Sequence, residues 1–404
     1  MVAPVQPRAT ARLLLIGDRL VNIERRSTDN PGRPPAPPTL LVWDWGVRVF
    51  HWALLAAVLL ASGTGFLAPA NWLNAHLIGG TAIVALLGFR LVWGWNGSTY
   101  ARFASFALRA PRIVMHLREI ASGRGAGEPG HNPVGAVMVY VLLALLGLIS
   151  LTGLVVLGGV VKQGPLAGLT SYAVGRQWRG AHEALAIGLL VLIVGHLAGV
   201  VFESLRTGEN LALAMLTGRK HVRAVPGVVP HRAHPGRAAL LCAAIGLVAL
   251  LGSVRLAALP GLGVPVLAPE PLYARECGSC HLAYPPSLAS AASWTTVMAG
   301  LTDHFGENAE LDAASAAQLR SWLVAHASET ADTRVANLMR VADPASPQRI
   351  TTTPGWRRVH GDVPESLFRA PKVGAKGACA ACHEDAATAR FDPQAIAVPK
   401  ETNP

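Results

Sequence analysis

The sequence predicts an all-helical membrane protein that continues into a smaller, mainly helical and loop-rich domain. Only 15% of its 404 residues are charged, whereas a soluble domain carries about a quarter. Five apolar segments are long enough to cross a bilayer, because about 20 residues span the hydrocarbon core. The part that follows, residues 270–404, has no such segment and contains two copies of the motif Cys-x-x-Cys-His. The expected class is therefore all-α, with a membrane part first and a polar part second.

The apolar segments organise the first part of the chain. The predicted spans are 49–68, 72–94, 134–157, 181–203 and 238–259. The Pro-rich, polar stretch before them predicts a disordered segment over residues 1–41. No apolar core of a secretory signal follows the start of the chain.

Three further regions follow from these spans. Four spans are expected to form a bundle over residues 42–221, and a basic loop with the fifth span occupies residues 222–260. The Pro/Gly-rich stretch "LPGLGVPVLAPEP" leads into the last domain, residues 261–404. Within this domain, "SWTTVMAGLTDHFG" and "DAASAAQLRSWLVAHA" have the apolar periodicity of short amphipathic helices.

Arginine and lysine gather in alternate loops. They are frequent before the first span, between the second and third, and between the fourth and fifth, and sparse in the other two loops. Because cytoplasmic loops carry the excess of positive charge, the N-terminus is expected in the cytoplasm, in a bacterial inner membrane. Five crossings then place the last domain in the periplasm. The net charge of +11 is thus a topology signal, and without basic–aromatic alternation no nucleic-acid partner is expected.

Four of the five cysteines lie in the two motifs. The motif residues are Cys277, Cys280, His281, Cys379, Cys382 and His383. This motif is the attachment signature of c-type haem, in which two thiols add to vinyl groups and the histidine becomes an axial ligand of the iron. A thioredoxin-like redox pair does not need the histidine, and a zinc site built from both cysteine pairs does not need one in each copy. The fifth cysteine, Cys242, lies in an apolar stretch and is interpreted as a small buried side chain.

Each c-type iron has a sixth coordination position. The candidates outside the motifs are His304, His326, His360, Met298 and Met339. Spacing alone does not choose among them, because polar residues of this kind are common on protein surfaces.

Four histidines lie in or at the ends of the predicted spans: His51, His76, His182 and His196. Ionisable residues inside a membrane are candidates for function. Because His182 and His196 are 14 residues apart, they share one helix face at about 21 Å along the axis. The topology pairs His76 with His182 near the outside, and His51 with His196 near the cytoplasm. Paired imidazoles on facing helices are typical of b-type haem, so two b haems are predicted.

Arg90 follows His76 by 14 residues and shares its helix face at the cytoplasmic end. It is a candidate partner for a haem propionate, because a guanidinium group donates paired hydrogen bonds to a carboxylate. A basic residue that reaches for the membrane surface at the end of a span explains Arg90 equally well. Both interpretations stay open.

Several strings in the membrane part resemble the bacterial cytochrome b561 family. They are "VWDWGVRVFHW", "GFRLVWGWNGSTYARF" and "HLAGVVFESLRTGENLALAMLTGRK". The family includes the b-type subunits that anchor nickel–iron hydrogenases. The resemblance implies a four-helix bundle with two b haems that moves electrons between quinone and a partner. The fifth span has no counterpart in such a bundle and is interpreted as the tether of the last domain.

The last domain resembles the dihaem cytochrome c family. The matching strings are "ECGSCHLAYPPSL", "SWTTVMAGLTDHFGENAELD", "WRRVHGDVP" and "CAACHEDAATARFD". Members use histidine at the sixth positions, which implies that role for His304 and His360 and leaves the other candidates as bystanders. Proximity in the sequence favours His304 for the first haem and His360 for the second.

Together these features predict transmembrane electron transfer between a membrane quinone pool and a soluble periplasmic cytochrome or other haem protein. The electron carriers would be two b haems and two covalent c haems, as in a quinol:cytochrome c oxidoreductase. The membrane spans are expected to contact lipid, and a homodimer is a further expectation. Two alternatives remain: an oxidoreductase for superoxide or another small oxidant, and a membrane anchor subunit of a hydrogenase-like enzyme. If both c irons have two protein ligands, neither can bind a small molecule, so coordination discriminates between them.

Overall fold

The computed structural model describes residues 39–106, 108–123, 128–221, 231–265 and 270–399. Within these ranges the protein is built almost entirely from helices. The described strands, β1 (Leu40–Leu41) and β2 (Arg219–Lys220), form one short antiparallel pair. Most of the segment that was expected to be disordered lies outside the described residues.

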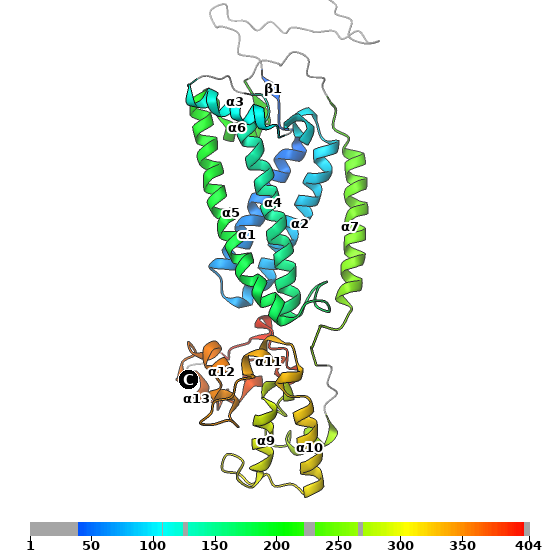
Figure 1. Cartoon of the computed structure of the whole chain (residues 1–404), viewed down its shortest axis with the longest axis vertical. Coiled ribbons are helices and arrows are strands. Elements are labelled where there is room, and N and C mark those ends of the chain that lie inside the picture. Colours follow the sequence, from blue (N-terminus) through cyan, green and yellow to red (C-terminus); the bar gives the residue numbers. More distant parts are fainter. Residues whose placement is uncertain (1–38, 107, 124–127, 222–230, 266–269, 400–404) are drawn as a thin grey trace, which may run out of the picture. The chain divides into compact units, whose positions relative to one another are not determined.

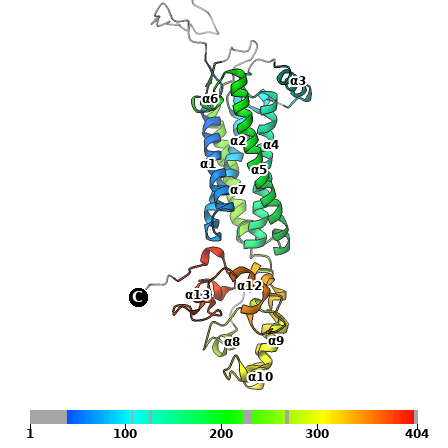
Figure 2. The same cartoon turned by 90° about the vertical axis from the view of Figure 1, so that its left-hand side faces the viewer.

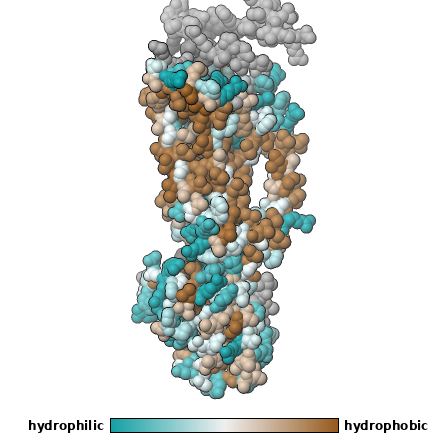
Figure 3. Space-filling model, viewed as in Figure 1, coloured by the Kyte–Doolittle hydropathy of each residue, from teal (hydrophilic) through white to brown (hydrophobic). Residues whose placement is uncertain are grey.

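Five helices are long and apolar enough to cross a membrane, which confirms the predicted membrane part. They are α1 (Trp45–Phe66), α2 (Leu73–Asn96), α4 (Pro133–Val156), α5 (Tyr172–Thr207) and α7 (Pro235–Ala257). The helices α1, α2, α4 and α5 run side by side as a four-helix bundle (Figures 1 and 2), and α7 packs against α2. Apolar residues cover the visible length of these helices (Figure 3), as contact with lipid requires.

The helix α5 begins nine residues before the span that hydropathy predicted. Its first turn is capped by Ser171, whose hydroxyl accepts a hydrogen bond from Val174 N. The extra turns carry Arg176 and Arg179, which exclude them from an apolar window but not from a helix. The helix α4 likewise continues through one π-helical turn, Leu157–Val161.

The middle of the bundle is closed by small and branched apolar side chains. The buried cluster consists of Ala57, Val58, Ile83, Leu146 and Leu189, so that all four helices contribute. The helices α1 and α2 are tightly packed at Gly79, where an added Cβ would lie 3.0 Å from Ala61 N. Since lipid removes the hydrophobic drive between helices, such close packing of small residues is what holds a membrane bundle together.

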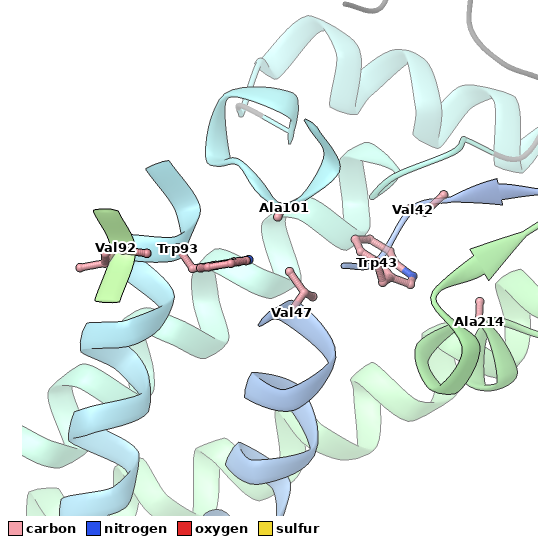
Figure 4. Packing of buried hydrophobic residues seen from close by; sticks show 8 residues of the cluster. Val42, Trp43, Val47, Val92, Trp93, Ala101 and Ala214 are labelled. Carbon is pink, nitrogen blue, oxygen red and sulfur yellow. The ribbon is translucent and has the colours of Figure 1, made fainter. Parts of the chain in front are cut away.

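A second buried cluster closes the end of the bundle at which α1 begins (Figure 4). Asp44 caps α1 by accepting a hydrogen bond from Val47 N at 2.9 Å. The same carboxylate accepts bonds from Trp93 Nε1 at 3.0 Å and Ser98 N at 3.0 Å, near the end of α2. One side chain therefore fixes the start of α1 to the end of α2. The short helices α3 (Ala110–Ala121) and α6 (Leu211–Thr217) lie at this end too (Figure 1).

The C-terminal domain consists of short helices joined by 3-10 turns and loops. The helices are α8 (Pro271–Glu276), α9 (Ala291–Ala299), α10 (Ala313–Ala325), α11 (Arg334–Met339), α12 (Pro354–His360) and α13 (Glu365–Arg369). One buried cluster gathers around Trp294 and Leu319, and another around Met339 and Trp356. The two predicted helices correspond to α9 and α10, although α9 ends at Ala299 and the chain turns before His304.

An ion pair between a buried lysine and a partly exposed aspartate joins the loop after α4 to the C-terminal domain. Lys162 ends the π-helical turn in a left-handed conformation, with φ 58°. Its ammonium group donates to Asp332 at 2.9 Å and to the carbonyl of Thr170 at 3.0 Å. Asp332 also accepts a bond from Tyr172 N at 2.7 Å, at the start of α5. A buried charge with several matched partners is costly to disturb, so these contacts define a specific junction.

Candidate haem sites

His76 and His182 face each other from α2 and α5. The centres of their rings lie 6.2 Å apart, with the planes at 77°. His76 Nδ1 lies 2.9 Å from the carbonyl of Ala61 on α1. On the other side, His182 Nδ1 lies 3.0 Å from Thr152 Oγ1 and 3.1 Å from the carbonyl of Ile149, both on α4. With Nδ1 of each ring engaged in this way, Nε2 is the nitrogen left for a metal.

Two glycines make room for these rings. A Cβ at Gly65 would lie 3.2 Å from His76 Cε1, and a Cβ at Gly153 would lie 3.2 Å from His182 Cε1. Both distances are shorter than ordinary van der Waals contact, so a side chain at either glycine would displace the imidazole. The neighbouring helices α1 and α4 are therefore shaped around the two histidines.

His51 on α1 and His196 on α5 are the predicted second pair in the bundle, and their pairing stays a prediction. His51 Nδ1 is buried, and it has no hydrogen-bond partner within the described part of the chain. A buried polar nitrogen without a partner costs about 1–3 kcal/mol. The unpartnered nitrogen of His51 is thus a polar atom that a bound group could satisfy.

The first Cys-x-x-Cys-His motif begins where α8 ends. Its histidine, His281, has its ring centre 6.2 Å from that of His304, with the planes nearly parallel at 28°. His281 Nδ1 lies 2.8 Å from the carbonyl of Leu282, which leaves Nε2 for a metal. Burial and the neighbouring Glu276 raise the pKa of the Cys277 thiol to about 11. A thiol that keeps its proton matches the attachment reaction, which adds S–H across a vinyl double bond.

The second motif is arranged in the same way around His383. Its ring centre lies 6.1 Å from that of His360, at the end of α12. The His360 ring stacks on Trp356 at 4.4 Å, and its Nδ1 lies 3.1 Å from the carbonyl of the same residue. Burial, and after it the neighbouring His360, lower the pKa of His383. Burial therefore favours the neutral imidazole, which is the form that binds a metal.

Three separate histidine pairs thus share one spacing. Two imidazoles on opposite sides of one iron, each nitrogen about 2 Å from the metal, place their ring centres about 6 Å apart. The observed 6.1 to 6.2 Å agrees with this geometry. The residues present therefore fit a haem held by two histidines at each of the three sites.

The zinc alternative for the cysteine motifs does not fit the described residues. Among them, no group of three or more His, Cys, Asp or Glu side chains gathers around one point as a metal site would require. The four motif cysteines accordingly do not converge on one ion.

Arg90 is buried among aromatic rings, with only 3% of its surface exposed. Its Nη1 donates to the carbonyl of Ala101 at 3.1 Å, and its guanidinium carbon lies 4.6 Å from the centre of the Phe103 ring. The hydrogen bond and the aromatic ring hold the guanidinium in place. A contact with a haem propionate stays a prediction.

The other candidates for the sixth positions are engaged elsewhere. Met339 is buried in the core of the C-terminal domain, and its sulfur accepts a hydrogen bond from the hydroxyl of Thr353. Met298 packs against the other cluster of that domain. The ring of His326 packs against that of Trp322 at 5.1 Å, whereas the rings opposite the motif histidines are those of His304 and His360.

Several residues that support the sites carry no signal in the sequence. Thr152, Gly65 and Gly153 were not singled out because their importance comes from the neighbouring helix. Tyr284, whose ring lies 5.0 Å from that of His281, is another such residue. A glycine or threonine in an apolar span could have been a pointer, since these residues mark close helix contacts in membranes.

Comparison with family models divides the chain in two. Residues 42–218 match prokaryotic cytochrome b561, and residues 273–391 match dihaem cytochrome c. Comparison with curated proteins finds no match.

Solved structures similar to this chain are dihaem cytochromes c. A dihaem cytochrome c from Rhodobacter sphaeroides is 39% identical; the match covers 30% of this chain and 97% of that one, with a TM-score of 0.27. A second structure from this organism is 37% identical, covers 31% and 98%, and has a TM-score of 0.25. One from Shewanella baltica is 34% identical, covers 33% and 95%, and has a TM-score of 0.27.

The fold and the histidine pairs define a membrane-spanning haem protein. The membrane part matches the model of prokaryotic cytochrome b561, and the C-terminal domain belongs to the dihaem cytochrome c family. The b561 domain binds b haems, and the C-terminal domain, from here on the c domain, binds two c haems. Both resemblances seen in the sequence are thereby confirmed, and the protein is a carrier of electrons across a membrane.

Proposed function

We propose that the protein transfers electrons between the quinone pool of a bacterial inner membrane and a soluble haem protein in the periplasm. A quinol that is oxidised releases two electrons and two protons, and the electrons leave one at a time to the soluble acceptor. The bound irons supply the one-electron chemistry. The chain contributes ligands, spacing and the surroundings that tune each potential.

Four sites would hold the haems. The outer b site consists of His76 and His182, and the inner b site of His51 and His196. The first c site consists of Cys277, Cys280, His281 and His304, and the second of Cys379, Cys382, His383 and His360. Arg90 is proposed as a partner of a propionate at the inner b site, and α7 as the tether that delivers the c domain to the periplasm.

The opposed histidines carry this proposal. In each of three pairs, both rings stand at the spacing of two axial ligands, 6.1 to 6.2 Å. An iron with two axial imidazoles has no position left for a substrate, which suits electron transfer. Superoxide or another small oxidant would need an open position at the iron or reaction at a haem edge. The doubly ligated sites therefore favour the electron carrier over that alternative.

The orientation rests on charge. Basic residues gather in the loops on the same side of the membrane as the N-terminus, and an excess of positive charge is typical of cytoplasmic loops. The Cys-x-x-Cys-His motifs agree with this orientation, because bacteria attach c haem outside the cytoplasmic membrane.

The decisive experiment counts haems and follows their reduction. Pyridine haemochrome spectra of the purified protein should give two b and two c haems per chain, and all four should be low-spin by electron paramagnetic resonance. In membranes, a quinol analogue should reduce the b and c haems before an added soluble cytochrome is reduced. A protein whose haems stay oxidised with every quinol, although dithionite reduces them, would overturn the role of quinone.

A further inference from the structure

We propose that the second c site receives electrons from the bundle, and that Tyr284 connects it to the first c site, from which electrons leave. The order would be outer b site, second c site, first c site. This order rests on the proposed function, because it states the sequence in which electrons from quinol would pass through the haem sites.

The segment that follows the second motif is bonded to the motif itself. Ala397 N donates to the carbonyl of Cys382 at 2.8 Å. In return, Glu384 N donates to the carbonyl of Ala395 at 3.0 Å. These two bonds enclose His383, which forms an antiparallel bridge with this segment. The segment therefore moves with the second c site as one unit.

The same segment also contacts the bundle. Its 3-10 turn, η11 (Pro393–Ala395), packs against η1 (Ala70–Trp72) and against α2. Directly before that turn, the carboxylate of Asp392 accepts a hydrogen bond from the side-chain amide of Gln163. The turn η1 leads into α2, and His76 follows four residues after Trp72. One short segment thus connects the second c site with the helix that carries the outer b site.

The first c site is bonded within the c domain. Ser279 Oγ donates to the carbonyl of Glu276 at 2.9 Å, beside Cys280. His304 and Glu307 bond to each other through their backbones. If the second site receives the electrons, the first site must be reached through a link within the c domain.

Tyr284 supplies such a link. Its ring lies 5.0 Å from the ring of His281, with the planes at 34°. Its hydroxyl donates to the carbonyl of Gly377, and the same carbonyl accepts a bond from Cys379 N at 2.8 Å. A continuous set of contacts thus runs from the axial histidine of the first site to an attachment cysteine of the second. The ring of Tyr284 also packs against both hydrophobic clusters of the domain.

Transfer between haems favours the shortest and best-packed route, because tunnelling through protein weakens steeply with distance. Each step oxidises one iron from Fe(II) to Fe(III) and reduces the next, with no bond made or broken. Tyr284 acts as a positioning residue, since it fixes the two c sites relative to each other and is not itself oxidised.

The order is tested by removing one c haem at a time from the full-length protein. In Cys379→Ala/Cys382→Ala, quinol should still reduce the b haems, but reduction of the first c haem should slow at least tenfold. In Cys277→Ala/Cys280→Ala, reduction of the second c haem should keep its rate. The opposite pattern would overturn the order. If quinol reduces no b haem even in the unmodified protein, the proposed function fails and the order is then judged from potentials alone.

Potentials provide that second measurement and need no loss of c haem. In His182→Leu, which should lack the outer b haem, the midpoint potential of the second c haem should shift, while that of the first should not. The charge of a neighbouring iron acts mainly over short distances in protein. A shift confined to the first c haem would refute the order.

The link is tested by Tyr284→Leu and Tyr284→Phe. The leucine variant should slow reduction of the first c haem at least tenfold and leave reduction of the second unchanged. The phenylalanine variant keeps the ring but loses the bond to Gly377, so it should shift the potential of the second c haem. Tyr273→Phe is the matched control for the phenylalanine variant, because it removes a hydroxyl that donates to the carbonyl of Tyr284 and not to that of Gly377, beside the second motif. Wild-type kinetics and potentials in both Tyr284 variants would remove Tyr284 from the route.

Discussion

The imidazoles of His76 and His182 lie 6.2 Å apart, and each is oriented by a helix other than its own. The carbonyl of Ala61 on α1 holds the first ring, and Thr152 with Ile149 on α4 holds the second. All four helices of the bundle therefore contribute to one pair of rings. This explains why a four-helix bundle is a suitable frame: two helices supply ligands and the other two fix the tautomer of each ring.

Replacing one histidine of each pair should remove one b haem at a time. We expect His182→Leu and His196→Leu each to lower the b haem content from two to one per chain, with both c haems retained. A single imidazole holds the haem more weakly, since the opposite axial ligand is lost. Pyridine haemochrome spectra of the purified variants measure this ratio.

His116→Leu is the control for these variants. His116 is buried at the same end of the bundle as the inner b site, but it pairs with Glu119 on its own helix α3. The His116→Leu variant should therefore retain two b haems and two c haems. If His182→Leu also retained two b haems, the assignment of ligands in the bundle would be wrong.

Thr152→Val should change a potential without changing the haem content. The substitution removes the hydroxyl 3.0 Å from His182 Nδ1 but leaves the carbonyl of Ile149 as an acceptor. One hydrogen bond contributes about 1 kcal/mol, so the ring should stay in place while its basicity changes. A redox titration should show one b haem with a shifted midpoint and the other unaffected. Unchanged midpoints for both b haems would show that Thr152 does not tune the site.

How far the sequence predicts the sites depends on where each residue lies. His182 and His196 lie on one regular helix, so the helical repeat alone relates their positions. His304 and His360 lie at the ends of short elements, where no periodicity applies, and only resemblance to a family singled them out. Lys162 lies in one of the loops that are sparse in basic residues, and no pattern relates it to its partner Asp332, which lies far away in the sequence. Contacts that tertiary structure alone creates leave no local pattern.

Lys162→Met should loosen the junction between the bundle and the c domain. Removing one partner of a buried ion pair leaves the other charge poorly compensated. Asp332 keeps its hydrogen bond from Tyr172 N, and its side chain is 30% exposed. We therefore expect the free energy of unfolding to fall by about 1–3 kcal/mol. Thermal unfolding in detergent, followed by the haem absorbance, would detect it.

The matched control is Arg357→Met, which breaks the pair with Asp343 within the c domain. Arg357 is 63% exposed, and exposed pairs contribute less than about 1 kcal/mol. Equal effects of the two substitutions would show that the Lys162 pair is no stronger than a surface contact.

Reporter fusions test the orientation. A fusion after Arg223 should report the cytoplasm, and a fusion after Pro271 should report the periplasm. Between these points the chain crosses once, through α7. Alkaline phosphatase is active only in the periplasm, and green fluorescent protein exported unfolded fluoresces only in the cytoplasm. The two reporters should therefore give opposite patterns. A cytoplasmic signal after Pro271 would contradict both the span count and the attachment of c haem.

Opening the sixth position at the first c site should convert an electron carrier into a haem that binds small molecules. In the unmodified protein His281 and His304 stand 6.2 Å apart across the site, so the reduced protein should not bind carbon monoxide at any c haem. His304→Ala removes one ligand, and the reduced variant should show the absorbance of a carbon monoxide complex at one c haem, with a high-spin signal when oxidised. His326→Ala should behave like the unmodified protein, because the ring opposite His281 is that of His304, and His326 packs against Trp322 instead. Binding of carbon monoxide by the unmodified protein would revive the small-oxidant alternative, since it would show that a coordination position is already open.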